Sequence, residues 1–202
     1  WFDLEQRLEP EDKAVKTILP GTNMARLVMV HWQDVANGTD CYVADAPETG
    51  FLRKECLELF DEVVAWSTKA GMWTVLTGRA KAGPAGHVLN DPTLSKQMCE
   101  MWRFIAARYS GVSNIAGYEV LSEPRIDDAA KIHAFHVAAC DAVWISDPRA
   151  ACFIGSGPYY DRYNLMDDRY ILNGTGPVIY AANYLTPKPY TKGELTNISY
   201  PS

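Results

Sequence analysis

The sequence predicts an α/β protein, part of a (β/α)8 TIM barrel with a parallel sheet, on three observations. Short apolar runs alternate with segments of helical spacing along most of the 202 residues, a pattern typical of βαβ units. The apolar runs are continuous, which indicates strands buried on both faces of a sheet. No glycine-rich phosphate-binding turn opens a predicted helix, so a dinucleotide-binding fold is disfavoured and a barrel is favoured.

The first half of the chain contains two predicted helices and two predicted strands. A helix is expected over residues 10–19, because a proline and acidic residues favour its first turn. The apolar run 24–30 predicts a buried strand. Residues 51–69 place apolar side chains at three- and four-residue spacing, which predicts a helix closed by Gly71. The run 72–77 then predicts the second strand.

The second half continues the alternation with two helices and three strands. Apolar residues recur at helical spacing over 92–109 and again over 126–144. The predicted strands are 115–121, 151–154 and 177–182. Five strands fall short of the eight in a complete barrel, which takes about 250 residues. We therefore expect residues 1–202 to form a single, incomplete barrel domain.

The composition excludes several classes of partner. The chain has 19 Lys and Arg against 25 Asp and Glu, and its net charge of −6 disfavours nucleic acid and anionic membrane surfaces. No apolar run approaches the roughly 20 residues of a membrane span. The six Trp and eleven Tyr suit a protein core, but also the flat apolar faces of sugar rings.

Three Asn-x-Ser/Thr triplets indicate a secreted glycoprotein. They begin at Asn37, Asn173 and Asn197, each in turn-like sequence that a glycosyltransferase can reach. Chance occurrence of such triplets is the alternative. The chain begins at Trp1 without a basic and apolar leader, so it is interpreted as a mature product or a fragment. We expect an extracellular location.

The cysteines and histidines do not form a recognisable metal motif. The five cysteines are odd in number and lack CxxC spacing, which disfavours a zinc cluster. Cys41 lies in a loop where it can form a disulfide, with the partner left open. His133 and His136 stand three residues apart on a helix, where a solvated face is favoured over a metal site. No metal or other cofactor is expected. Three cysteines on predicted helices are expected to be small core residues, namely Cys56, Cys99 and Cys140.

Polar and aromatic residues follow the predicted strands, at the edge where barrel enzymes carry their active sites. Glu123 is the most distinctive, because it follows the apolar run 115–121 and Pro124 then stops the strand. A carboxylate at a barrel mouth among aromatic residues suits a general acid. The alternatives are a helix-start acid or a partner for a neighbouring arginine. The other residues at these strand ends are His31, Trp32, Arg79, Ser122, Ser156, Tyr159, Tyr160, Asn183 and Tyr184.

Two charged residues lie within predicted strands. Arg26 interrupts the run 24–30, and a buried arginine needs a carboxylate or several acceptors. It either orients a catalytic carboxylate or forms a purely structural ion pair. Glu119 lies in the run 115–121 and is expected to pair with a lysine or arginine.

These residues lie in stretches that together resemble family 5 glycoside hydrolases, the cellulase-like barrels of clan A. Residues 21–32 look like that family's second strand, and 60–77 like its next helix and third strand. Residues 101–109 with the Ser-Glu-Pro strand 117–124 look like the following helix and fourth strand, and 178–187 like the sixth strand. The resemblance implies that roughly strands two to six are present and that the barrel is truncated before its seventh strand.

By this resemblance the chain is a secreted hydrolase that cleaves a β-linked polysaccharide, of cellulose, β-glucan or mannan type, by a retaining two-carboxylate mechanism. Glu123 matches the acid/base, Arg26 the orienting arginine, and Tyr184 the tyrosine that contacts the nucleophile. The nucleophile ends the family's seventh strand and is expected to lie outside this sequence. Contacts with the oligosaccharide or polysaccharide are expected from Ser122, Arg79, Asn183, Trp32, Tyr159 and Tyr160.

Three substitutions favour an alternative function. Arg79 and Asn183 stand where the family usually has histidines, and Ser122 replaces the asparagine that binds a sugar hydroxyl. A degenerate barrel that binds glycan, or serves as a structural module with other chains of an extracellular assembly, is therefore the second hypothesis. A metal-dependent hydrolase is the third, and it fits poorly because His and Asp are scarce at the strand ends.

Overall fold

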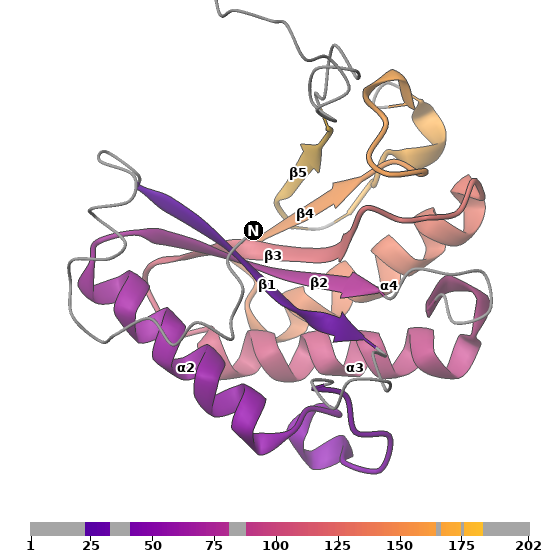
Figure 1. Ribbon diagram of the computed structural model, residues 1–202. Coiled ribbons are helices and arrows are strands. Elements are labelled where there is room, and N and C mark those ends of the chain that lie inside the picture. The colour runs from indigo at the N-terminus through magenta and orange to yellow at the C-terminus, as the bar shows by residue number, and fades with distance from the viewer. Residues whose placement is uncertain (1–22, 33–40, 81–87, 165–166, 175, 184–202) are drawn as a thin grey trace, which may run out of the picture.

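The computed structural model describes residues 23–32, 41–80, 88–164, 167–174 and 176–183. Five parallel strands form one sheet in the order β1-β2-β3-β4-β5, and Figure 1 shows it with its helices. The elements are β1 (Met24–Trp32), η2 (Pro47–Thr49), α2 (Lys54–Lys69), β2 (Trp73–Ala80), η3 (Val88–Asn90), α3 (Pro92–Tyr109), β3 (Ile115–Ser122), α4 (Ala129–Ser146), β4 (Ala151–Gly155), η4 (Arg162–Asn164), η5 (Asp168–Tyr170) and β5 (Val178–Ala181).

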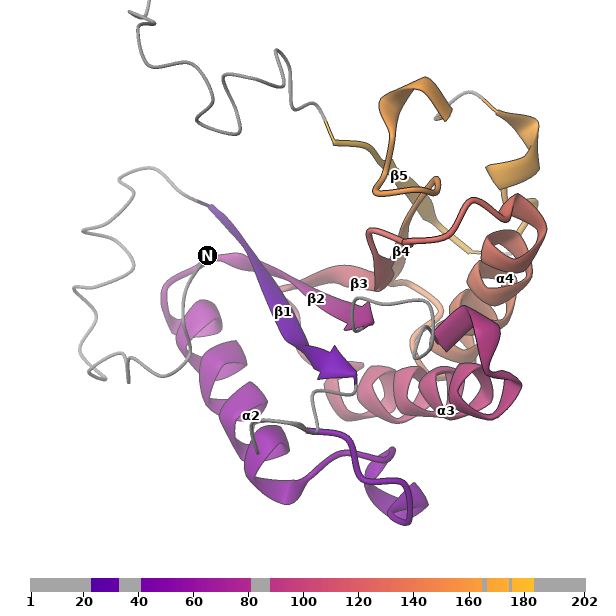
Figure 2. The same cartoon turned by 45° about the vertical axis from the view of Figure 1, so that its right-hand side comes forward.

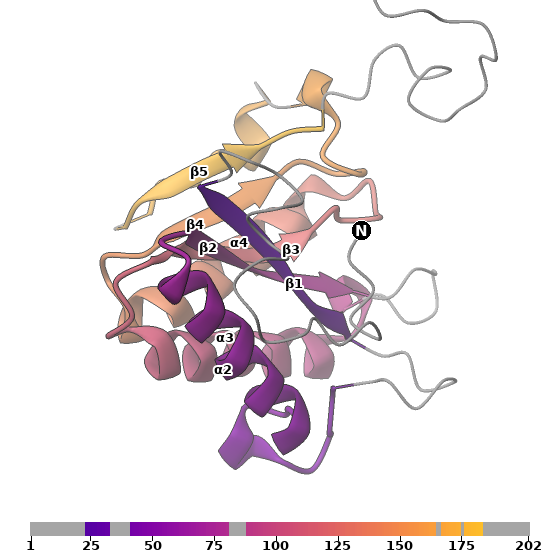
Figure 3. The same cartoon turned by 60° about the vertical axis from the view of Figure 1, so that its left-hand side comes forward.

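The order of the strands is that of a barrel wall. Each strand pairs with the next along the chain, and helices connect the first four, as in consecutive units of a (β/α)8 barrel. Figures 1, 2 and 3 show α2, α3 and α4 on the same face of the sheet. The predicted α/β class and all five predicted strands are therefore confirmed.

Predicted and observed elements differ mainly where helices start. α3 has the predicted bounds, because Asp91 accepts hydrogen bonds from the backbone N–H groups of Thr93 and Leu94 at 2.9 and 3.2 Å, as an N-cap does. α4 begins later than predicted because Asp128 caps it through the N–H of Lys131. The predicted helix 10–19 lies outside the described residues.

The start of α2 is tied to the preceding loop by a disulfide between Cys41 and Cys56, with Cα atoms 5.8 Å apart. The N–H of Arg53 also donates to the carbonyl oxygen of Cys41 at 2.8 Å. The assignment of Cys56 as a simple core residue was wrong, since helical spacing carries no information about a partner in a loop. Cys140 is buried and Cys99 partly buried, both as free thiols.

The main core lies between the sheet and α3. Trp102 of α3 is fully buried and packs edge-on against Tyr118 of β3, with ring centroids 5.9 Å apart. Its indole N–H donates to the carbonyl oxygen of Val120 at 2.9 Å. A Cβ atom at Gly78 of β2 would lie 2.7 Å from the Trp102 ring, so only glycine permits this approach. This packing fixes the position of β3, whose carboxyl end carries Glu123.

His136 lies in this core and not on a solvated face, which corrects the sequence-based expectation. It has no exposed surface, and neither ring nitrogen has a hydrogen-bond partner among the described residues. Burial, and to a smaller degree the charge of His133, lowers the pKa of His136 from 6.5 to about 3. His133 is only partly buried, and its Nε2 lies 3.2 Å from the carbonyl oxygen of Ile171.

Acidification is expected to destabilise the protein through His136. The unfolded imidazole binds a proton near pH 6.5, whereas the folded one stays neutral down to about pH 3. The stabilising contribution is therefore complete above pH 6.5 and is lost as the pH falls below it, at about 1.4 kcal/mol per pH unit. Denaturant unfolding of the wild type and of His136→Leu should show a shallower pH dependence in the variant, while carboxylate titration affects both proteins alike. Equal slopes would contradict this account.

Candidate active site

The carboxyl ends of the parallel strands place most of the predicted site residues at one edge of the sheet. Arg26 comes from β1, Arg79 from β2, and Ser122 and Glu123 from the end of β3. Thr77 of β2 lies opposite Glu119 in the β2–β3 register, and Arg79 lies opposite Ser122. Tyr159, Tyr160 and Asn183 join them from the segments that follow β4 and β5.

An ion pair between Glu119 and Arg26 forms the inner part of the site. Glu119 is only 3% exposed, and its two carboxylate oxygens accept hydrogen bonds from Nε and Nη2 of Arg26. Thr77 Oγ1 also donates to Glu119 Oε2 at 2.8 Å. Burial alone would lower the pKa of Arg26, but hydrogen bonds to Glu119 and its charge raise that pKa above the usual value. The predicted pairing of Glu119 with a basic residue is confirmed.

Ser122 supports Arg26. Its Oγ accepts a hydrogen bond from Arg26 Nη2 at 2.7 Å, and the residue is buried. A direct contact between this hydroxyl and a sugar was predicted. The structure instead shows the hydroxyl engaged with the arginine, so we assign it to the support of the Arg26–Glu119 pair.

Tyr160 packs beside the same ion pair. It is 3% exposed, and its hydroxyl donates to the carbonyl oxygen of Leu121 at 2.6 Å. Burial, followed by the charge of Glu119, raises the pKa of Tyr160 well above its usual value. The prediction of a sugar-stacking platform at Tyr160 is corrected, because the buried ring has no open face.

Glu123 forms the outer part of the site. It follows β3 directly, has a left-handed backbone with φ 50°, and its side chain is 27% exposed. Asn183 Nδ2 donates to Glu123 Oε1 at 2.7 Å, and Arg79 Nη2 lies 3.4 Å from Glu123 Oε2. The carboxylate is therefore held at both oxygens and remains accessible. Asp128, and not Glu123, is the helix-start acid of α4.

Tyr159 lies next to Glu123 and presents an exposed ring. Its N–H donates to the carbonyl oxygen of Pro124 at 2.8 Å, and its own carbonyl oxygen accepts from Asn183 Nδ2 at 2.8 Å. The residue is 52% exposed, with the Arg125 guanidinium carbon 5.8 Å from the ring centroid. Tyr159 and Tyr160 both have left-handed backbones, with φ 59° and 58°, and such strain concentrates at functional sites.

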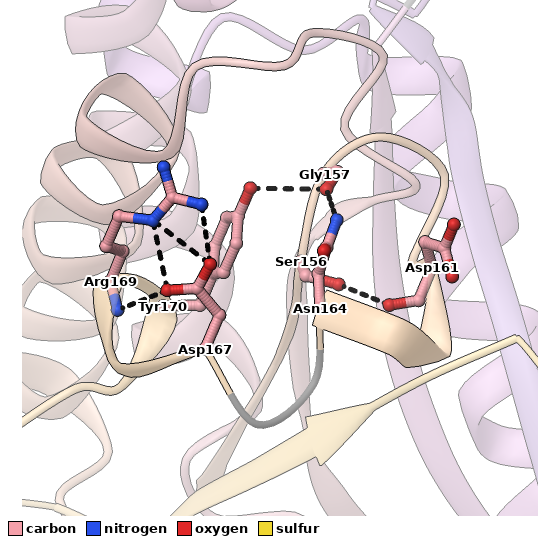
Figure 4. A network of polar contacts seen from close by, with 7 residues as sticks. All are labelled: Ser156, Gly157, Asp161, Asn164, Asp167, Arg169 and Tyr170. Atoms are coloured by element: carbon pink, nitrogen blue, oxygen red, sulfur yellow. Dashed lines mark hydrogen bonds and ion pairs between the residues drawn. The ribbon is translucent and has the colours of Figure 1, made fainter.

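The loop after β4, which carries Tyr159, is braced by polar contacts (Figure 4). Ser156 Oγ donates to the carbonyl oxygen of Asp161 at 2.9 Å. The carbonyl oxygen of Gly157 accepts from Asn164 Nδ2 at 2.8 Å and from the Tyr170 hydroxyl at 3.2 Å. A Cβ atom at Gly157 would lie 2.4 Å from the carbonyl oxygen of Ile126, so this loop packs tightly against the segment after β3.

Several predicted residues cannot be placed in this site. Tyr184, Asn37 and Asn197 lie outside the described residues, as does the side chain of Trp32 at the end of β1. Asn173 is exposed. Thr77 was missed by the sequence analysis, although a polar residue in an apolar strand opposite Glu119 is the signal that identifies it. Within the described ranges, no group of three or more His, Cys, Asp or Glu is placed to hold a metal ion.

The family model for cellulase, glycosyl hydrolase family 5, matches residues 10–182. The chain belongs to glycosyl hydrolase family 5. Among curated proteins, no sequence matches it significantly. None of the helices in the described ranges is both long enough and apolar enough to span a membrane.

Several solved structures share the fold. The Pseudomonas stutzeri endoglucanase Cel5A matches with a TM-score of 0.64 and 19% identity, over 79% of this chain and 48% of its own. Thermotoga maritima Cel5A, solved in complex with cellobiose, matches with a TM-score of 0.66 and 18% identity, over 81% of this chain and 49% of its own. The cellulose synthase subunit Z from Clostridioides difficile matches with a TM-score of 0.68 and 16% identity, over 84% of this chain and 52% of its own. The chain thus spans about half the length of these proteins, which confirms the partial (β/α)8 barrel.

Proposed function

We propose that the protein is a secreted glycoside hydrolase that cleaves O-glycosidic bonds of a β-linked polysaccharide of cellulose, β-glucan or mannan type. Its membership of family 5 supports this proposal. Several of the similar structures are described as endoglucanases, among them one from Pseudomonas stutzeri and one from an uncultured bovine rumen ciliate. Another contains cellobiose.

The position of Glu123 is the observation that carries the proposal. It is a partly exposed carboxylate at the carboxyl end of β3, held by Arg79 and Asn183 beside the exposed ring of Tyr159. In a retaining mechanism, this residue would protonate the leaving glycosidic oxygen and then remove a proton from the attacking water. Tyr159 would stack on a sugar ring next to the bond that breaks.

The mechanism also requires a carboxylate nucleophile, about 5–5.5 Å from the acid/base. Glu119 does not meet this requirement, because it is buried and both of its oxygens accept hydrogen bonds from Arg26. We assign the nucleophile to a residue outside the described sheet. Arg26 would act by holding Glu119 in the inner part of the site. Tyr184 is retained as the proposed contact to the nucleophile, and Trp32 as a proposed contact to the substrate.

A panel of polysaccharides tests this function. The protein at its natural length should release reducing ends from cellulose, mixed-linkage β-glucan or mannan, and NMR of the first products should show the β-anomer if configuration is retained. Binding to the same panel without hydrolysis would select the second hypothesis, a degenerate glycan-binding module. Neither binding nor hydrolysis would reject both.

Secretion is proposed from the disulfide and the glycosylation triplets. The Cys41–Cys56 bond is typical of oxidising compartments, and Asn173 is exposed where a glycan could be attached. After expression through a eukaryotic secretory pathway, we expect Asn173 to carry an N-glycan. Enzymatic removal should convert the linked asparagine to aspartate, seen by peptide mass spectrometry. Thr175→Ala should abolish the modification and Thr175→Ser should retain it, whereas unmodified wild-type peptide would refute the assignment.

A further inference from the structure

We propose that Tyr163, together with Arg162, is a second saccharide-binding platform on the loop after β4, separate from the site at Glu123. Its ligand would be the apolar face of a pyranose ring in a β-linked oligosaccharide. The inference rests on the proposed function, because it names a further place where the same polysaccharide binds.

The exposure of Tyr163 is the first observation behind this proposal. At 76% exposure, it is the most exposed of the large aromatic side chains in the described residues. It lies in η4, on the segment between the carboxyl end of β4 and β5. Single exposed aromatic residues are common on protein surfaces, so exposure alone does not define a site.

The contact with Arg162 is the second observation. The guanidinium carbon lies 4.7 Å from the centroid of the Tyr163 ring, and Arg162 Nη2 donates to the Tyr163 hydroxyl at 2.7 Å. The arginine thus covers one face of the ring and fixes its edge, and the opposite face is left for a ligand. A ring fixed before binding loses less conformational entropy when a sugar stacks on it.

The backbone beneath the ring is also fixed. The N–H of Tyr163 donates to Asp161 Oδ1 and the N–H of Asn164 to the carbonyl oxygen of Asp161, each at 3.0 Å. The Asn164 side chain reaches back to Gly157 in the braced loop of Figure 4. These contacts form a rigid turn, and such a turn suits the display of a binding side chain better than a mobile loop does.

The turn is connected to the catalytic carboxylate. Asp161 forms a bridge with Asn183, and Asn183 holds Glu123 through its side chain. The platform therefore keeps a fixed position relative to Glu123. A polysaccharide that occupies both places must be longer than one that reaches Glu123 alone, so affinity should increase with the length of the oligosaccharide.

Titration of the 202-residue chain with oligosaccharides tests this inference. Binding of cello- and manno-oligosaccharides of increasing length is followed by NMR chemical-shift changes. Tyr163→Ala is expected to weaken the binding of long oligosaccharides roughly tenfold. Tyr163→Phe should lose much less affinity, because the ring remains and only its hydrogen bond with Arg162 is removed. Ile145→Ala, at an equally exposed position near the end of α4, is the matched control and should bind as the wild type does.

The outcomes separate this inference from the proposed function. If the wild type binds and Tyr163→Ala binds equally well, the platform is rejected and the proposed function stands. If the wild type binds none of the saccharides, the platform is rejected, and the hydrolysis assay on the polysaccharide panel decides the proposed function separately. If Tyr163→Phe is as weak as Tyr163→Ala, the hydroxyl and not the ring face makes the contact, and stacking is rejected.

Discussion

Glu123→Gln is expected to lower kcat for hydrolysis of the preferred β-glucan or mannan by roughly 10²–10⁴-fold, the usual contribution of general acid–base catalysis. Glutamine has the same shape and can still accept the hydrogen bond that Asn183 donates to Oε1 of Glu123. It cannot give a proton to the leaving oxygen or accept one from water. Binding should change little, so KM should stay near the wild-type value.

Substrates that do not need a general acid provide the control. The phenolate of an aryl glycoside with a strongly acidic phenol leaves without being protonated. The variant should therefore form the glycosyl-enzyme from such a substrate at nearly the wild-type rate. Azide should then accelerate turnover, because an anionic nucleophile needs no general base. Glu58→Gln, an exposed carboxylate of α2, is the matched variant and should be fully active. Unchanged hydrolysis of polysaccharide by Glu123→Gln would reject the assignment.

Arg26→Met is expected to destabilise the fold by about 3–5 kcal/mol, the cost of leaving a buried charge without its partner. Glu119 is almost completely buried, whereas the side chain of Arg26 is 49% exposed. Removing the arginine therefore leaves the buried carboxylate hydrogen-bonded to Thr77 but without the positive charge of its partner. Removing the carboxylate instead leaves an arginine that water can solvate. Glu119→Gln should accordingly cost less, about 1–3 kcal/mol.

The double variant Arg26→Met with Glu119→Gln tests the origin of this difference. It removes both charges together, so it should recover part of the stability lost by Arg26→Met alone. Urea unfolding of the three variants and the wild type measures all four free energies. If the costs of the single changes are equal and add in the double variant, the ion pair is not the cause.

Elements that a single local pattern determines could be predicted from the sequence. Apolar runs predicted all five strands, and the Asp91 cap with its following proline explains why α3 has the predicted bounds. Glu123 was predicted to lie at the end of a strand, before a proline, and the structure places it in a partly exposed position there. Its role as the acid/base stays a prediction.

Contacts that depend on tertiary structure could not be predicted in the same way. The buried residues of α4 recur at three- and four-residue spacing on one side of the helix, and His136 lies among them. The polar side chain, and not its position, favoured the solvated face in the prediction. Tyr159 and Tyr160 are adjacent and chemically identical, and only the packing of the loop against β3 decides which ring is buried. The partner of Glu119 depends on the position of β1 relative to β3, two strands away in the sheet.

The side-chain amide of Asn183 has a consequence for how substrate binding and catalysis are connected. Its nitrogen carries two hydrogens, and it donates both to Glu123 Oε1 and to the carbonyl oxygen of Tyr159. A single nitrogen atom therefore connects the proposed acid, Glu123, to the backbone of Tyr159, the residue that would stack on the sugar. A substitution that removes this amide would therefore release the Glu123 side chain and the Tyr159 backbone together.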